Sequence, residues 1–346
     1  MMGTPHPSGW RPMEPEPQAV LAPLTSAALI LVGTVGPEPD HADRVRGFAA
    51  DLPGLVRAVG FRDQDAGLTC VVGFGALAWP RLFGTPAPPE LHPFVPLDGV
   101  HSAPSTPGDV VFHIRAGRLD LCFELATRIL DTLRGALRPE VEVQGFRFFD
   151  NRDLLGFVDG TENPTGPSRA AAALVPDGEH AGGSYLVVQK YLHDLDAWNS
   201  LSIAAQERII GRDKLANVEL DEDALRTSAH RLLTTITDPD GTERKILRDN
   251  MPFGSPAAGE FGTLFLGYAA TPTVLEAMLR NMFLGDPPGN YDRILDFSTA
   301  VTGGLFFAPS VPLLDELAAT PPAVEGGLSI GSLKGGPPTR PGGSPT

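Results

Sequence analysis

The sequence contains few cysteines and no long apolar run. Its only two cysteines, Cys70 and Cys122, stand 52 positions apart without CxxC or Cys/His spacing, which excludes a zinc ribbon and a disulfide scaffold. No segment offers about 18 uninterrupted apolar residues, so a membrane-spanning helix is excluded as well. The short apolar stretch from Ala27 to Val35 lacks a preceding basic region and a cleavage motif, and we interpret it as a strand. We therefore expect a cytoplasmic protein in a reducing compartment.

Basic residues are also scarce. The chain has 27 Lys and Arg against 42 Asp and Glu, a formal net charge of −15. A surface this negative repels phosphate backbones and anionic lipids, so we expect neither nucleic acid nor a membrane as partner. The apolar share of 42% and the charged share of 20% are ordinary for a globular protein. With about one domain per ~150 residues, 346 residues suggest two domains.

Two similar successions of elements follow one another along the chain. Apolar patterning predicts strand, helix, strand, strand, helix and strand over 27–34, 42–58, 68–74, 109–115, 119–137 and 141–149. The same order is predicted again over 184–191, 202–210, 244–250, 262–269, 272–284 and 302–308. This is the β-α-β-β-α-β order of a ferredoxin-like unit, so we expect an α+β protein with two such halves, 27–150 and 151–317. Residues 1–26 and 318–346, rich in Pro or Gly, are expected to be flexible.

The helix over 272–284 has the clearest local signals. Thr271 suits the N-cap, Pro272 the first helical position and Gly285 the residue after the helix. Leu275, Met278, Leu279, Met282 and Phe283 recur at helical spacing, and we interpret this stripe as core.

The segment ILRDNMPF places a cation beside an amide. Because side chains alternate along a strand, Arg248 and Asn250 point to one face and Asp249 to the other. In a dry pocket, Arg248 could stabilise charge that develops on a bound oxygen species, with Asn250 orienting it. The alternative is an ordinary solvated sheet edge.

The segment GFVDGTENP, from Gly156 to Pro164, is first of all a turn, because Asp-Gly is a strong turn signal. Its acids do not follow the DxDxDG spacing of a calcium loop. A further possibility is that the turn holds Asp159 beside a reaction centre as an acid–base group.

None of the eight histidines pairs with another as HxxxH or HxH, which argues against a multi-histidine metal site. An axial ligand to a haem needs one histidine only, and His230 opens a short apolar run in LRTSAHRLLTTITD. We expect His113 and His193 to be surface groups or satisfied core groups.

Five segments together resemble a known family. GFVDGTENP, GGSYLVVQKYLHDLDAWNSLS, ERIIGRDKL, ILRDNMPFG and GDPPGNYDRILDFSTAVTGGLFF are similar to bacterial dye-decolourising peroxidases of the B-type group. The resemblance implies two ferredoxin-like halves with antiparallel sheets, of the dimeric α/β barrel-like superfamily. It also implies one haem b per chain, which hydrogen peroxide converts to a ferryl state that oxidises dyes, phenols or other one-electron donors.

The resemblance also assigns roles to residues. His230 would bind the iron, while Asp159, Arg248 and Asn250 would face the peroxide and Arg248 would also contact the bound haem. Arg212, in IGRDKL, resembles the arginine that meets a haem propionate.

The second ring nitrogen of the proximal histidine is expected to bond a carboxylate, with Asp292 the first choice and Asp296 the second. Electrons from bulky donors would cross the protein surface, with Tyr185, Tyr191, Trp198 or Tyr268 as candidate relays. By analogy with the family we expect a homo-oligomer. A haem-binding or iron-handling protein without significant turnover is the alternative function.

Half of the last 26 residues are Gly or Pro, yet the string LSIGSLKGG carries three aliphatic side chains, Leu328, Ile330 and Leu333. Exposed apolar anchors in an extended peptide are typical of a docking motif, although three chance aliphatics in a disordered end are the plain alternative. The string resembles the targeting peptide that loads cargo enzymes into encapsulin shells. That resemblance implies packaging in an encapsulin nanocompartment through the shell protein.

Overall fold

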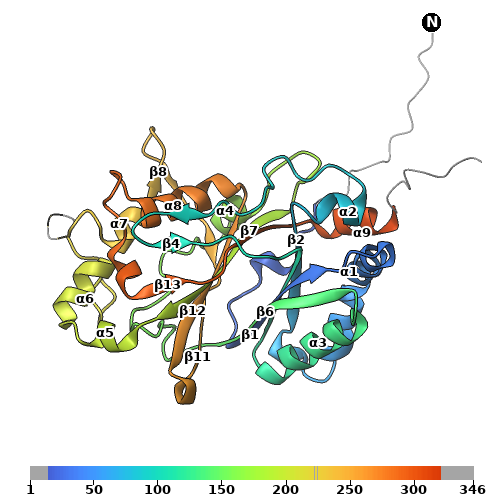
Figure 1. Ribbon diagram of the computed structural model, residues 1–346, viewed down its shortest axis with the longest axis horizontal. Coiled ribbons are helices and arrows are strands. Elements are labelled where there is room, and N and C mark those ends of the chain that lie inside the picture. The colour runs from blue at the N-terminus through green and yellow to red at the C-terminus, as the bar shows by residue number, and fades with distance from the viewer. Residues whose placement is uncertain (1–14, 222, 224, 321–346) are drawn as a thin grey trace, which may run out of the picture.

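The computed structural model describes residues 15–221, 223 and 225–320, and these residues build one large antiparallel sheet covered by helices (Figure 1). Ten strands of the described chain belong to the sheet, whose main path is β10-β12-β7-β14-β2-β5-β1-β6, with β11 paired to β12 and β13 to β7. No helix among the described residues is long and apolar enough to cross a membrane.

The first half supplies four strands in ferredoxin-like order. The elements are β1 (Ala27–Val35), α1 (Pro39–Gly60), β2 (Thr69–Gly75), β5 (Val110–Ala116), α3 (Leu119–Thr132) and β6 (Leu137–Phe146). In the sheet they run β2-β5-β1-β6. The first strand thus lies between the third and the fourth.

The second half repeats this order, with the helix expected over 202–210 observed as α6 (Ile203–Ile210) after β7. Its elements are β7 (Ser184–His193), β10 (Leu247–Arg248), β11 (Met251–Ser255), β12 (Glu260–Ala269), α8 (Pro272–Leu284) and β14 (Gly304–Ala308). Here β12 lies between the β10/β11 pair and β7, and β14 lies on the other side of β7. The two halves merge where β14 pairs with β2, at Phe306 opposite Gly75 and Phe307 opposite Phe74. The expected pair of ferredoxin-like halves is confirmed.

The second half carries additional short elements. These are α4 (Ser168–Ala173), α5 (Leu195–Asn199), α6 (Ile203–Ile210), α7 (His230–Thr234), β8 (Ile236–Thr237), β9 (Glu243–Arg244), β13 (Ser298–Ala300) and α9 (Val311–Ala319). The single strand expected over 244–250 is wrong in detail. Residues 243–244 pair with β8, whereas 247–248 pair with β12, so the chain changes partner between them.

An insertion in the first half reaches across to the second. It contains α2 (Trp79–Phe83) and a hairpin of β3 (Leu97–Asp98) and β4 (Ser102–Ala103). The hairpin packs with β3 against α8 and with β4 against β13, as Figure 1 shows for β4. A loop of the first half thus covers part of the second.

The expected flexible N-terminus, residues 1–26, is wrong for residues 15–26. Gln18 is buried; its Nε2 donates to the carbonyl oxygens of Val72 and Pro309 at 2.9 Å each, and its Oε1 accepts from Val72 N at 2.8 Å. Val20 is buried as well. At the other end α9 extends to Ala319, and Leu328, Ile330 and Leu333 lie outside the described residues.

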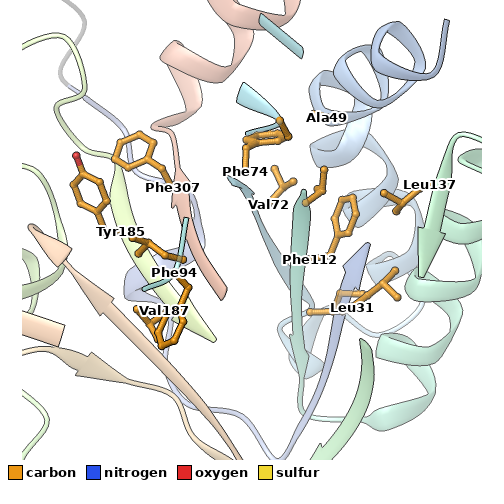
Figure 2. Packing of buried hydrophobic residues seen from close by; sticks show 14 of the residues in the cluster. Leu31, Ala49, Val72, Phe74, Phe94, Phe112, Leu137, Tyr185, Val187 and Phe307 are labelled. Atoms are coloured by element: carbon orange, nitrogen blue, oxygen red, sulfur yellow. The ribbon is translucent and has the colours of Figure 1, made fainter. Parts of the chain in front are cut away.

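Side chains of alternating parity build two separate apolar clusters on the two faces of the sheet. Along β1, Leu29 and Leu31 join Phe112 in the larger cluster, which includes residues of α1, α3 and α8. Ile30 and Val32 point the other way and join the second cluster. Figure 2 shows part of the larger cluster, with Tyr185 and Phe307 in edge contact at 4.9 Å between ring centroids. This packing fixes the strands that carry the site.

Candidate active site

A cavity of about 200 Å³ lies in the second half. Its wall is formed by the segment after Asp153, by β10, by α7 and by one face of α8. Apolar side chains make up much of the lining: Phe157, Ile210, Phe265, Leu275, Met278 and Leu279. A few polar side chains converge on this apolar space, which is the usual composition of a cofactor site.

His230 is the first residue of α7 and lines this cavity. Its Nδ1 lies 2.6 Å from Oδ2 of Asp292, a carboxylate with no exposed surface. The other carboxylate oxygen of Asp292 accepts a hydrogen bond from Ile294 N at 3.0 Å. A carboxylate only accepts, so in the neutral imidazole this contact places the proton of His230 on Nδ1 and leaves the lone pair on Nε2. Nε2 has no hydrogen-bond partner within the described part of the chain.

The sequence left Asp292 and Asp296 as competing partners of the histidine, and the geometry separates them. Asp296 lies 3.0 Å from His101 Nε2 and accepts hydrogen bonds from Tyr291 and Arg293 at 3.0 and 2.6 Å. Asp292 alone of the two contacts His230.

Asp159, Arg248 and Asn250 line another part of the same cavity. Asn250 Nδ2 donates to Asp159 Oδ2 at 2.9 Å, and Gly160 N donates to Asp159 Oδ1 at 2.6 Å. The expected Asp-Gly turn is present, because Gly160 adopts the left-handed region at φ +75°. These two bonds fix the carboxylate with both oxygens occupied by N–H donors.

The guanidinium of Arg248 forms no hydrogen bond or ion pair with any residue that the structure describes, but its backbone is held on both sides. Asn163 Nδ2 donates to Arg248 O at 2.7 Å, and Asn163 Oδ1 accepts from Arg248 N at 2.8 Å. The side-chain amide of Asn163 therefore bonds the backbone of Arg248 as the backbone of a paired strand would. Asn163 was not singled out from the sequence, and its position just before Pro164 is the only local signal.

Arg212 lines the cavity and is surrounded by other charged side chains. Arg212 pairs with Glu162 and with Glu219, the latter at 2.8 Å, and Lys245 lies 2.9 Å from Glu162. Burial tends to raise the pKa of Glu162, but the Lys245 hydrogen bond and the Arg212 charge hold it below its ordinary value. Arg212 and Lys245 together can meet anionic groups of a bound molecule.

Asp153, another residue that sequence reasoning missed, also lines the cavity. Burial and the neighbouring charge of Asp159 raise the pKa of Asp153 to about 7, although hydrogen bonds from backbone amides oppose the shift. This carboxyl therefore titrates near neutral pH.

Asp249, between Arg248 and Asn250, points to the opposite face, as alternation predicts. It forms a buried ion pair with Arg115 at 2.5 Å, and His113 Nδ1 lies 2.8 Å from the Tyr268 hydroxyl beside it. Burial, with Arg115 nearby, lowers the pKa of His113 well below its ordinary value. His193 is satisfied, because its two ring nitrogens bond Ser298 and Thr263, whereas Nε2 of the fully buried His113 has no hydrogen-bond partner in the described chain.

Comparison with known proteins identifies the family. The model of the Dyp-type peroxidase N-terminal domain matches residues 17–147, and that of the Dyp-type peroxidase C-terminal domain matches residues 150–312. The chain belongs to the Dyp-type peroxidase family. A dye-decolorizing peroxidase of Mycobacterium tuberculosis is 58% identical over 329 residues, which covers 93% of this chain and 98% of the relative.

Solved structures of Dyp-type peroxidases agree with this family assignment. DyPB from Rhodococcus jostii RHA1 superposes with a TM-score of 0.85 at 56% identity, covering 87% of this chain and 98% of that one. Variants of the same protein have been solved in complex with heme. The encapsulated DyP-type peroxidase from Mycobacterium smegmatis gives a TM-score of 0.85 at 55% identity, covering 87% of this chain and 98% of that one.

The expected family and the haem-dependent peroxidase activity are thus confirmed, and the alternative of a haem carrier finds no support. The cavity suits the haem of a Dyp-type peroxidase. Its apolar walls match a porphyrin face, its imidazole nitrogen Nε2 is available, and Arg212 and Lys245 match propionates.

Proposed function

We propose that the cavity holds haem b with His230 Nε2 as the iron ligand, and that Asp159, Arg248 and Asn250 act on hydrogen peroxide there. The observation that carries this proposal is the presence, in one cavity, of the His230–Asp292 pair and of the Asp159–Asn250 pair. Neither pair is needed for an ordinary apolar core. The two together supply a metal ligand and an acid–base group.

Haem, when bound, supplies the iron on which peroxide is reduced and stores oxidising equivalents. The protein prepares the ligand for it: Asp292 accepts the Nδ1 proton of His230, which fixes the tautomer and the ring orientation and raises the basicity of Nε2. Because Asp292 is itself held by Ile294 N, the carboxylate keeps its position.

Asp159 moves the proton. Cleavage of peroxide requires a proton to leave one oxygen and to arrive on the other, and a carboxylate within reach of both can carry it. The amide of Asn250 and the backbone of Gly160 hold the Asp159 carboxylate in one orientation. Asn250 thus orients the proton carrier.

Arg248 stabilises the negative charge that appears when the oxygen–oxygen bond breaks. Its guanidinium is permanently cationic and, within the described chain, forms no hydrogen bond or ion pair with a carboxylate. Asn163 holds the backbone from which this side chain projects. Arg212 and Lys245 would meet the haem propionates at the cavity rim.

Two variants of the purified haem-loaded protein test these roles. Asp159→Asn should bind haem normally but slow the reaction with peroxide, whereas His230→Ala should lose the haem absorption band or show a ligand-field spectrum without histidine. Retention of the wild-type spectrum in His230→Ala would assign the iron ligand to another residue and overturn the proposal.

We further propose that the protein is an oligomeric cytoplasmic cargo of an encapsulin shell. The encapsulated relative from Mycobacterium smegmatis and the tail string LSIGSLKGG, with Leu328, Ile330 and Leu333, support this proposal. Deletion of residues 326–346 should leave haem content and turnover intact while it abolishes copurification with the shell protein. Continued encapsulation after the deletion would refute the role of the tail.

A further inference from the structure

Bulky electron donors pose a problem of access. The cavity measures about 200 Å³. A haem that occupies this cavity leaves no room in it for a polycyclic dye. Electrons from such donors have to enter at the protein surface, through a side chain that can lose and regain a single electron. Tyrosine and tryptophan are the side chains with this chemistry.

One tyrosine alone combines this chemistry with exposure in the described part of the chain. The relays expected from the sequence are all buried, and so is Trp79; none of these five side chains is more than 8% exposed: Tyr185, Tyr191, Tyr268, Trp79 and Trp198. Tyr291, which the sequence did not single out, is partly exposed. Among the described tyrosines and tryptophans, a donor at the surface can therefore reach Tyr291 only.

Tyr291 also has a partner for its phenolic proton. Its hydroxyl donates to Asp296 Oδ1 at 3.0 Å, and the same oxygen lies 3.0 Å from His101 Nε2. Burial tends to raise the pKa of Asp296, but the hydrogen bonds from His101, Arg293 and Tyr291 lower it below its ordinary value. Asp296 is thus ionised at neutral pH and ready to accept a proton.

The buried Tyr191 offers a contrast. Its hydroxyl donates to the amide oxygen of Gln189 at 3.0 Å, and an amide does not take up a proton at neutral pH. Burial raises the pKa of Tyr191 far above its ordinary value, and the charge of Asp292 raises it further. Oxidation of Tyr191 would therefore leave the proton without a carboxylate acceptor.

The position of Tyr291 links the surface to the proposed iron ligand. Tyr291 immediately precedes Asp292, whose carboxylate bonds His230 at 2.6 Å. The ring of Tyr291 packs edge-on against His101, 5.2 Å between centroids, and Arg293 lies 5.8 Å from the ring centroid. His101 comes from the β3–β4 hairpin of the first half, so both halves contribute to the surroundings of Tyr291. A path from the phenol to His230 thus runs along the chain from Tyr291 to Asp292 and across the Asp292–His230 hydrogen bond.

We propose that Tyr291 is the surface site at which aromatic donors too large for the cavity deliver their electrons. The inference rests on the proposed placement of haem at His230. In each cycle the Tyr291 phenol gives one electron to the peroxide-oxidised cofactor and its proton to Asp296, which leaves a neutral phenoxyl radical. The donor then gives one electron to this radical, and the proton returns from Asp296 to restore the phenol. Two such cycles use the two oxidising equivalents of one peroxide.

The haem-loaded Tyr291→Phe variant tests this assignment. We expect kcat/KM for a sulfonated anthraquinone dye to fall by about tenfold or more, while the rate of the first reaction with peroxide changes by less than about twofold. In the absence of a donor, the tyrosyl radical signal in electron paramagnetic resonance should decrease. Tyr185→Phe, which removes a buried phenol outside the cavity lining, should match the wild type in all three measurements.

Unchanged dye oxidation in Tyr291→Phe, or an unchanged radical signal, would overturn the assignment. The proposed function has a separate criterion, the haem absorption of His230→Ala, so that failure of one is distinguishable from failure of the other. Asp296→Asn keeps the phenol but removes the proton acceptor, and it should also slow dye oxidation. A dye rate equal to that of the wild type would contradict the role of Asp296.

Discussion

The side chain of Asn163 bonds both backbone polar groups of Arg248, donating to its carbonyl oxygen at 2.7 Å and accepting from its N–H at 2.8 Å. The neighbouring pair, Asn250 with Asp159, joins the same two segments in the reverse sense, because there the amide comes from the segment between β10 and β11 and the carboxylate from the turn. The turn and the strand are thereby fastened to each other at two points. Their reactive side chains, a carboxylate and a guanidinium, keep a fixed relation.

Asn163→Ala should therefore slow the reaction with peroxide without reducing haem content. Loss of the amide frees the backbone at Arg248 and leaves its N–H and C=O without these partners, which costs about 1–3 kcal/mol of stability. We expect the second-order rate constant with peroxide, measured by stopped-flow absorption, to fall by about tenfold. Asn199→Ala, at an exposed position, is the matched control; equal rates in both variants would contradict a positioning role for Asn163.

Arg248→Leu should have a larger effect on the same rate constant. Removal of a preorganised cation that stabilises developing charge typically costs about two to three orders of magnitude in rate. Arg248→Lys keeps the positive charge but lacks the planar guanidinium. Its rate constant with peroxide should lie between those of Arg248→Leu and the wild type. Stopped-flow kinetics of Arg248→Leu identical to the wild type would remove this residue from the mechanism.

The sequence predicted features that depend on neighbouring residues. The helix over 272–284 was predicted with its observed bounds, because Thr271, Pro272 and Gly285 mark both ends locally, and the Thr271 hydroxyl does accept from Thr273 N. The ferredoxin-like order followed from the succession of elements. Burial of Gln18 was not predictable, because its partners Val72 and Pro309 are 54 and 291 positions away.

In the site too, features that depend on neighbouring residues were predicted and those that depend on distant residues were not. Alternation along the chain predicted that Arg248 and Asn250 share a face, and both line the cavity, although β10 ends at Arg248. The Asn163 clamp joins residues 85 positions apart, and the exposure of Tyr291 depends on how the first half packs over the second. Both are properties of the tertiary structure, so the local sequence did not predict the role of either residue.

Asp292→Asn should change the electronic properties of the cofactor. An amide in place of the carboxylate makes the His230 imidazole a weaker donor, which favours the reduced iron. A tenfold change in the preference between oxidation states corresponds to about 60 mV for one electron, and we expect an upward shift of this order in a redox titration. Asp296→Asn, four positions along and without contact to His230, should leave the potential unchanged. A shift of equal size in both variants would contradict a specific role for Asp292.

Asp153→Asn should alter how stability depends on pH. Burial and the charge of Asp159 raise the folded-state pKa of Asp153 to about 7, from an ordinary value of 3.8. Between these values the folded protein holds a proton that the unfolded chain has released, so the stability contributed by Asp153 is present below pH 3.8 and is lost as pH rises to about 7. The Asp153→Asn variant has no carboxyl at this position, so it does not lose this stability as pH rises.

The free energy of unfolding in urea, measured at pH 5 and at pH 8 for both proteins, checks the sign. The stability of Asp153→Asn relative to the wild type should increase from pH 5 to pH 8, because only the wild type has to ionise a buried carboxyl over that range. Other groups that titrate in the same range, such as His193, whose pKa burial lowers to about 4, contribute equally to both proteins and cancel in the difference. A difference that is constant with pH, or that decreases toward pH 8, would show that Asp153 does not titrate near neutrality in the folded protein.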